Sequence, residues 1–443
     1  MTRPGFRTMA GLGMIDAFVV RLLSFLTFAA LARILPRSEI GALGVAQGAM
    51  AVLAFIDLCP EAILFRDYVS MKGQMARYLG AYLLFWALKS ALMLLAAAMI
   101  GAAMAARYAA PALLLIILGY AATARAASLG TLGREVSYIE GRQAIIVLVN
   151  AATGAAVLGA VICLSPRYGL AVYLLMLLVQ GGVQALFWLA LLARAHGIRW
   201  PRLSQAHQVA ADIRHSVMSY ALWTHLSGVS TGLLYRSDVF VLSALGTPLS
   251  LLGTYSICLS VANWMVVVPQ MLEKALLVTW APLVKDGHDG LQIRRLWLRW
   301  AAICCGFTVA VWLAWRLGMG AWLVKGDTAR ANAYIVPLIG GITIRALVGP
   351  VSVLAALCCI KRYVAVVYAP ALAAGLAVLV ALVLAFGVLG AAWANVAMYG
   401  IVAAWSLAFA YRDSSIRGWL RGARLPTSIE AASPRASEEG LRS

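Results

Sequence analysis

Four basic side chains lie inside long apolar runs of the sequence, and they are the residues most able to do chemistry: Arg21, Lys89, Arg236 and Arg345. The chain around them is 63% hydrophobic. A charge near the centre of a bilayer costs about 3 to 10 kcal/mol unless it faces protein or water. Each cation therefore needs a buried partner or a wet cavity. A cavity lined by Arg and Lys would bind an anion.

Four carboxylates in or beside the same runs are the candidate partners: Asp16, Asp57, Glu61 and Asp238. Asp57 and Glu61 are four residues apart, so they share one helix face, and Asp16 lies at a similar depth. We expect these three to form an acidic patch near the inner mouth. Two roles stay open for it. It could be a gate of salt bridges, or it could exchange protons, because carboxylates at close range do not all stay ionised. Proton exchange predicts that transport responds to an imposed pH gradient.

The apolar runs are long enough to cross a membrane, which takes about 20 helical residues. They predict an all-α polytopic membrane protein with about 12 spans. The expected spans are 12–34, 42–64, 78–104, 110–131, 143–164, 170–193, 216–244, 251–272, 300–323, 333–357, 364–386 and 389–411. The first run is too long for a cleavable signal peptide, so we expect it to stay as an anchor.

The formal charge of +19 is placed unevenly along the chain. Most of the 36 Lys and Arg residues fall on the side of the predicted spans that holds both termini. This asymmetry predicts cytoplasmic N- and C-termini. It also predicts attraction to anionic membrane lipids rather than to nucleic acid.

The sequence divides into two similar halves. The second span of each half follows Gly-bearing turns and carries a late proline, Pro60 in one and Pro269 in the other. Kinked helices at matching places are typical of a transporter whose site lies between two repeats. The predicted organisation is an N-terminal six-helix bundle (1–193), a cytoplasmic linker (194–215), a C-terminal six-helix bundle (216–411) and a cytoplasmic, disordered tail (412–443).

Motifs for other chemistry are missing from the sequence. There is no Walker A motif, no GxSxG and no HExxH, and none of the seven cysteines forms CxxC. We therefore predict neither a metal site nor a cofactor, and no enzyme. A membrane glycosyltransferase or ligase would need carboxylates on substantial outer loops. This chain offers only Glu39 and Asp327 on short ones.

Three segments resemble a known family. The segment Leu31–Asp67 (LARILPRSEIGALGVAQGAMAVLAFIDLCPEAILFRD) resembles the opening of bacterial polysaccharide-export flippases, the Wzx-like branch of the multidrug/oligosaccharidyl-lipid/polysaccharide (MOP) exporters. The segment from Arg236 to Tyr255 resembles the family's entry to its eighth span, and Gly387–Gly400 (GVLGAAWANVAMYG) its last span. The chain departs from the family pattern where Cys59-Pro60 replaces the usual Gly.

The resemblance implies two six-helix bundles around a central cavity that works by alternating access. It implies a polyprenyl-diphosphate-linked oligosaccharide as cargo, for polysaccharide export across the bacterial inner membrane. Membrane lipids and the polysaccharide polymerase and export machinery would be its partners. The residues fit this function, since a bare diphosphate cannot cross hydrocarbon and Arg matches phosphate geometry. A MATE-like exporter of a drug or metabolite is the alternative, although cationic drugs would favour a more acidic cavity.

Overall fold

The computed structural model describes residues 6–58, 73, 75–199, 222–271, 273, 290–413 and 416–417. Within these ranges every regular element is a helix, which confirms the all-α fold class. The elements are α1 (Phe6–Ile34), α2 (Arg37–Leu53), α4 (Met75–Tyr108), α5 (Ala112–Leu129), α6 (Thr131–Ile139), α7 (Gln143–Tyr168), α8 (Leu170–His196), α10 (Leu222–Ala244), α11 (Leu249–Trp264), α13 (Gly290–Ala314), η5 (Trp315–Met319), α14 (Gly320–Val324), α15 (Thr328–Leu347), α16 (Gly349–Cys358), α17 (Ile360–Tyr363), η6 (Val364–Tyr368) and α18 (Ala369–Arg412).

The helices make this chain a multi-pass membrane protein. In the described part of the chain, nine helices are long and apolar enough to cross a bilayer. The last of them is a stretch of 53 residues that holds two of the predicted spans. It breaks at Gly387, where a φ of 59° reverses the chain. Such a left-handed conformation favours glycine, and it falls in the turn expected at 386–388.

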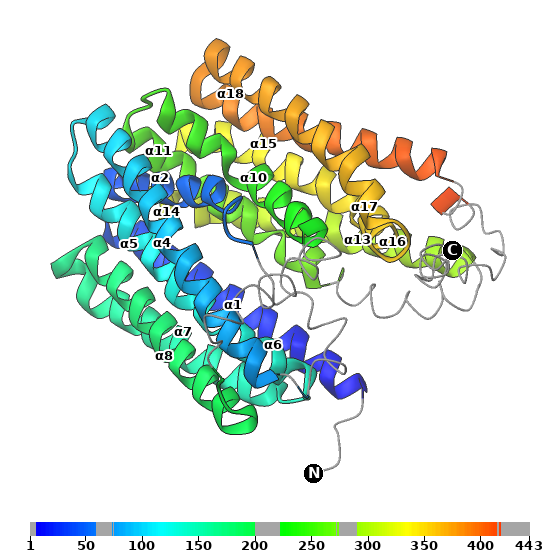
Figure 1. Ribbon diagram of the computed structural model, residues 1–443. Coiled ribbons are helices and arrows are strands. Elements are labelled where there is room, and N and C mark those ends of the chain that lie inside the picture. Colours follow the sequence, from blue (N-terminus) through cyan, green and yellow to red (C-terminus); the bar gives the residue numbers. More distant parts are fainter. Residues whose placement is uncertain are drawn as a thin grey trace, which may run out of the picture.

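Two groups of helices are visible in Figure 1. Helices α1 and α4 to α8 form one group, and helices α10 to α18 form the other. Inside the first group α1 packs on α7, and α5 packs on both α4 and α8. Inside the second, α15 packs on α18 and α11, and α10 packs on α18. We call them the N-bundle and the C-bundle. Their limits at residues 193 and 216 remain a prediction, and residues 200–215 of the expected linker lie outside the described residues.

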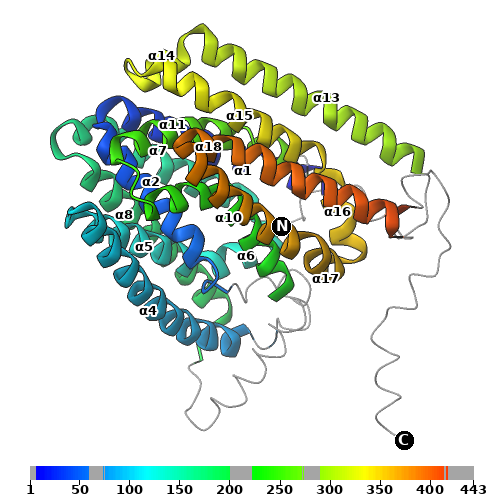
Figure 2. The ribbon, with the colours of Figure 1, turned by 90° about the horizontal axis from the view of Figure 1, so that it is seen from above.

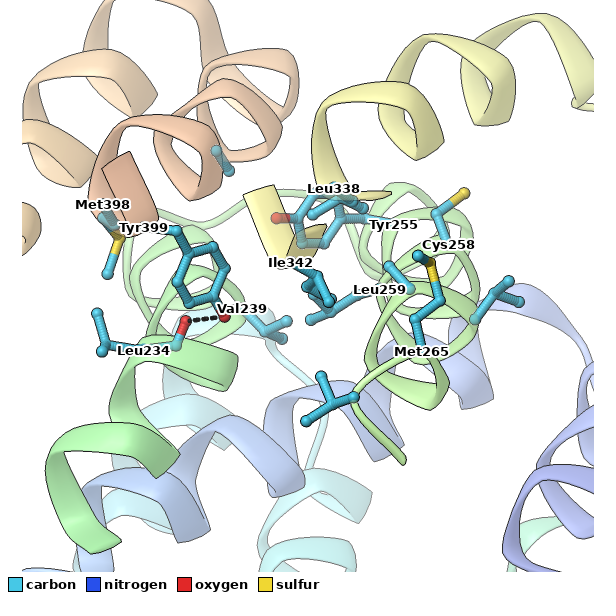
Figure 3. Close-up of a cluster of buried hydrophobic side chains, with 14 of the residues drawn as sticks. Leu234, Val239, Tyr255, Cys258, Leu259, Met265, Leu338, Ile342, Met398 and Tyr399 are labelled. Carbon is cyan, nitrogen blue, oxygen red and sulfur yellow. Dashed lines mark hydrogen bonds between the residues drawn. The ribbon is translucent and has the colours of Figure 1, made fainter. Parts of the chain in front are cut away.

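The core of the C-bundle fixes the relative positions of α10, α11, α15 and α18. Tyr255, Leu259 and Ile342 are buried where α11 meets α15 (Figure 3). The hydroxyl of Tyr399 on α18 donates to the carbonyl of Leu234 on α10, over 3.0 Å. Apolar packing and an interhelical hydrogen bond together hold these helices in a fixed register.

The two bundles meet at one end of the molecule. We call the end where α1 begins the N face, and the end where α1 finishes the far face; α18 also ends at the N face (Figures 1 and 2). Near the far face α2, which packs on α5 and α4 of the N-bundle, also packs closely on α11 and α10 of the C-bundle. A Cβ atom on Gly41 would collide with the backbone of Leu249, and one on Gly253 with the backbone of Arg37. The absence of side chains there lets the two backbones touch.

Polar contacts close the same end. Arg37 of α2 forms an ion pair with Asp327, at 3.1 Å, and donates to the carbonyls of Val324 and of Lys325 in the same loop. It also donates to Thr254 of α11, at 3.4 Å. We call Arg37, Thr254, Lys325 and Asp327 the far-face clamp. It ties the start of α2 to the C-bundle.

Removing the clamp should open the far face. The Arg37→Ala variant loses a partly buried ion pair and several carbonyl contacts, about 1 to 2 kcal/mol in all. The far-face-open population should therefore rise about 5- to 30-fold. Distances between spin labels at Ser38 and Thr328, in a background lacking the native cysteines, would show it as a longer-distance component.

Arg330→Ala is the matched control for this measurement. Arg330 also faces Asp327, but at 3.9 Å and with a side chain 63% exposed. An ion pair so open to solvent contributes little. Unchanged distances in Arg37→Ala, or equal changes in both variants, would show that the clamp does not hold the far face shut.

Candidate functional site

A cavity of about 1260 Å³ lies between the two bundles. Helices α1, α5, α6, α7 and α8 line one wall. The other wall is lined by α10, α15, α16, Tyr368 of η6 and residues between 266 and 273, which follow α11. Most lining residues fall in the N-face half or the middle of their helices, and Tyr173 near the start of α8 reaches furthest toward the far face. The cavity thus lies between the N face and the far-face clamp.

Arg21 lines the cavity from the middle of α1. Its Nη2 donates to the side-chain oxygen of Gln270, six residues after the end of α11, over 3.1 Å. Gln270 is neutral, so this bond orients the guanidinium without neutralising it. Arg21 therefore brings a net positive charge to the space between the bundles.

Arg345 lines the opposite wall, in the last turn of α15. The residue is 7% exposed, and its Nη2 donates to the hydroxyl of Tyr368 over 2.8 Å. Its Nε is buried without a hydrogen-bond partner. Glu273 interacts with it electrostatically but forms no ion pair with it in the described structure. A buried guanidinium with donors left over is prepared to bind an anion.

Arg236 lies just behind the cavity wall. It does not line the cavity itself, but it interacts electrostatically with Tyr120 and Tyr173, which do. Its Nη1 is buried without a hydrogen-bond partner. Arg236 also interacts electrostatically with Asp238, so its charge lies near two lining residues without belonging to the lining.

Lys89 is placed differently from the other three cations. Its Nζ lies 2.7 Å from Asp57 and donates to the carbonyl of Leu58 over 2.8 Å. Asp57 also accepts two hydrogen bonds from Arg125 of α5, one of them at 2.9 Å. We call Asp57, Lys89 and Arg125 the ion cluster. None of its members lines the cavity, so the structure does not bring Lys89 to the site where we expected it.

The expected acidic patch is divided in the structure. Asp16 lines the cavity and accepts a hydrogen bond from Asn150 over 2.8 Å. Asp57 belongs to the ion cluster, and Glu61 lies outside the described residues. Asp238 is buried within the C-bundle, where it accepts hydrogen bonds from Tyr255, Asn395 and the amide of Val239. The three described carboxylates, Asp16, Asp57 and Asp238, therefore hold separate positions.

The cavity is less cationic than the sequence suggested. Its described lining carries three cations and three carboxylates: Arg21, Arg134, Arg345, Asp16, Glu135 and Glu273. Arg134 and Glu135 are neighbours that form an ion pair at 3.4 Å. Sequence reasoning did not single out Arg125, Glu135 or Glu273. Arg125 lies inside the predicted span 110–131 and Glu273 directly follows the span 251–272, and these positions are the signal that could have found them.

Comparison with known proteins defines the fold class. No protein-family model matches the sequence, and no curated protein matches it significantly. Among solved structures, the chain has the fold of lipid-flipping and multidrug transporters of the MOP type.

Three of those structures are similar over most of their length. The lipid II flippase MurJ, in an inward closed conformation, has a TM-score of 0.62 and 10% identity, over 92% of this chain and 89% of that one. An inward-facing multidrug-resistance MATE transporter of the MOP superfamily has a TM-score of 0.60 and 14% identity, over 92% and 95%. The Vibrio cholerae MATE transporter VcmN, in a mutant form, has a TM-score of 0.53 and 13% identity, over 93% and 97%. At such low identity these likenesses establish the fold alone.

Proposed function

We propose that this protein is a flippase that carries a polyprenyl-diphosphate-linked oligosaccharide across the bacterial inner membrane by alternating access, for polysaccharide export. The observation that carries the proposal is the pair of guanidiniums, Arg21 and Arg345, that face one cavity from opposite bundles without an ion-pair partner in the described structure. A diphosphate offers two charged groups to such a pair, and Arg binds them with charge-assisted hydrogen bonds. The resemblance of the sequence to the Wzx-like exporters names the same cargo.

The dimensions of the cavity support a large head group. Pockets for drug-sized ligands measure about 300 to 1,000 Å³. The volume of about 1260 Å³ found here leaves room for sugar rings beside a diphosphate. The polyprenyl chain needs no room in the cavity, because it can stay in the lipid while the head group crosses.

The assigned sides of the membrane follow from the charge pattern. With the N face in the cytoplasm, the cavity would take cargo from the cytoplasmic side, and the far-face clamp would open to release it outside. Transport rather than catalysis is the role proposed, since the fold is that of transporters. The polymerase and export machinery would receive the cargo after release.

Export of a cationic drug or metabolite is the second candidate. Two observations favour it: the carboxylates Asp16 and Glu273 in the cavity, and the MATE transporters that share the fold. Such a substrate would be held by the acids and repelled by the arginines. The lipid-linked sugar is preferred because Arg345 is buried with an unused donor, and because the sequence resembles the Wzx-like exporters.

A flipping assay in proteoliposomes decides between the two candidates. The reconstituted protein should move a defined polyprenyl-diphosphate oligosaccharide between leaflets, and it should not accumulate a cationic dye such as ethidium. Protein-free liposomes and a heat-inactivated sample serve as controls. Dye transport without lipid flipping would overturn the proposal and favour the exporter.

The membrane potential should drive the proposed step. Moving about two negative charges out of a negative interior gains about 4 to 5 kcal/mol at 100 mV. An imposed potential, positive on the release side, should therefore shift the flipped fraction strongly toward that side. A potassium diffusion potential of each sign, applied to the same vesicles, would measure it. A flipped fraction that ignores the sign would contradict this step, because two positive charges would then have to cross together with the cargo.

A further inference from the structure

The two walls of the cavity differ in chemistry. The C-bundle wall carries Arg345 and Tyr368, with Arg21 reaching toward it from α1. On the N-bundle wall three neutral amides and a carboxylate lie together: Asn150 on α7, Gln180 and Gln184 on α8, and Asp16 on α1. The ion pair of Arg134 and Glu135 on α6 also lines this wall. Arg21 and Arg345, which have no ion-pair partner in the described structure, therefore share the cavity with polar groups that can both donate and accept. A diphosphate sugar has the same division, because its phosphates are charged and its sugar rings are neutral and rich in hydroxyls.

The amides of the N-bundle wall form one hydrogen-bonded network. Gln184 donates to Asn150 over 3.2 Å and to Thr153 over 2.7 Å. Gln180 donates to Thr153 over 3.3 Å, and Asn150 donates to Asp16 over 2.8 Å. We call these five residues the amide network. Each side chain is held in place by another, so the wall presents fixed polar atoms to the cavity.

The network leaves acceptors unused. The two donations by Gln184 occupy its amide nitrogen, while its carbonyl oxygen has no partner in the described structure. The side-chain oxygen of Gln180 and the second carboxylate oxygen of Asp16 also have no hydrogen-bond partner in the described structure. These three atoms are not among the buried side-chain atoms that lack a hydrogen-bond partner, so they are accessible. Because their residues line the cavity, hydroxyl groups there could donate to them.

Aromatic rings complete this wall. Tyr120, Tyr138 and Tyr173 line the cavity from α5, α6 and α8. An aromatic ring offers an apolar face with a polar tip, which suits the apolar face and the hydroxyl edge of a sugar ring. The part of this wall that holds the amides, Asp16 and the tyrosines is a surface for neutral polyols rather than for phosphate, and the Arg134 beside it is already paired with Glu135.

We propose that the amide network, with the tyrosines beside it, is the saccharide subsite that selects the sugar attached to the diphosphate. This inference rests on the proposed function and adds the residues that read the cargo. Gln180, Gln184 and Asp16 accept hydrogen bonds from sugar hydroxyls, while Arg21 and Arg345 hold the phosphates. A site built to bond a hydroxyl discriminates strongly against a ligand that lacks it, because its own polar atoms are then left unpaired.

The test compares two lipids that differ only in the sugar. The probes are polyprenyl-diphosphate-linked glucose and the sugar-free polyprenyl diphosphate, bound to the full-length protein in nanodiscs. Wild type should bind the glucosylated lipid more tightly. Gln180→Leu and Gln184→Leu should each weaken the binding of that lipid about tenfold and leave the sugar-free lipid within about twofold. The measured quantity is the ratio of the two affinities.

The ratio separates recognition from a structural role. Gln180→Leu removes one weak hydrogen bond, so its folding is the less disturbed of the two. Thr308→Val is the control, since it removes a hydrogen bond between α13 and α15, at 2.8 Å from Thr343, outside the main cavity. It should leave the ratio unchanged. If the Gln variants weaken the binding of both lipids equally, or if wild type binds both lipids equally well, the saccharide subsite is overturned while the proposed function stands. If wild type binds neither lipid, the proposed function falls together with it.

Discussion

Replacing Arg345 by Ala should reduce the flipping of a polyprenyl-diphosphate oligosaccharide about 10- to 100-fold. The variant loses a guanidinium that is 7% exposed and has an unused donor beside the cavity. A hydrogen bond to a charged group contributes about 1.5 to 3 kcal/mol, and burial keeps water from replacing it. Initial rates in proteoliposomes, at matched protein content, would measure the loss.

Three further variants show whether the charge itself is responsible. Arg345→Lys keeps the cation without the planar fork, so its rate should be intermediate. Tyr368→Phe removes the hydroxyl that orients Arg345 but leaves the cation, and it should keep most of the activity. Arg167→Ala is the control, because Arg167 stacks on Tyr168 in the last turn of α7 and does not line the cavity. Equal rates for Arg345→Ala and Arg167→Ala would remove Arg345 from the site.

Replacing Asp57 by Asn should destabilise the protein by about 3 to 5 kcal/mol. Asp57 is the one carboxylate of the ion cluster, and the side chains of Lys89 and Arg125 are 5% and 4% exposed. The variant leaves two buried cations facing each other without their anion. The temperature at which half of the detergent-solubilised protein has lost its monodisperse peak should fall clearly below that of wild type.

Two comparisons make this result specific. Lys89→Met should cost less, because Arg125 still pairs with Asp57. Arg362→Ala breaks an ion pair with Asp413 whose Arg side chain is 68% exposed, and such pairs contribute about 1 kcal/mol or less. If Asp57→Asn were as stable as Arg362→Ala, the ion cluster would not hold α4 and α5 to the end of α2.

The fold could be predicted from the sequence because membrane spans are a property of local composition. Apolar runs of sufficient length must be helices in lipid, and the turn at Gly387 is a local signal as well. A predicted span marks only the apolar part of its helix. The predicted ninth span begins at residue 300, while α13 begins at Gly290, because Arg residues in its first turns interrupt the apolar run. The mixture of basic and aromatic residues over 289–300 predicts the interfacial helix that precedes this span.

The candidate site could be predicted only in part. That Arg21 and Arg345 need an unusual environment follows from their position in apolar runs, but their neighbours are far away in the chain. Arg21 bonds to Gln270, which is 249 residues away. The same limit applies to Lys89, whose pairing with Asp57 depends on how α4 packs near the end of α2. In the sequence, Arg37 and Asp327 are charges of two separate loops, and nothing local shows that the far face brings them together.

The most direct test of the account is whether the cavity binds a diphosphate through Arg21 and Arg345. Farnesyl diphosphate and farnesol differ only in the charged group, and both are soluble enough for titration against the protein in detergent. The account predicts that wild type binds the diphosphate about 100-fold more tightly than the alcohol, and that the Arg21→Ala/Arg345→Ala double variant loses most of this preference. A wild-type protein without the preference, or a double variant that keeps it, would contradict the account.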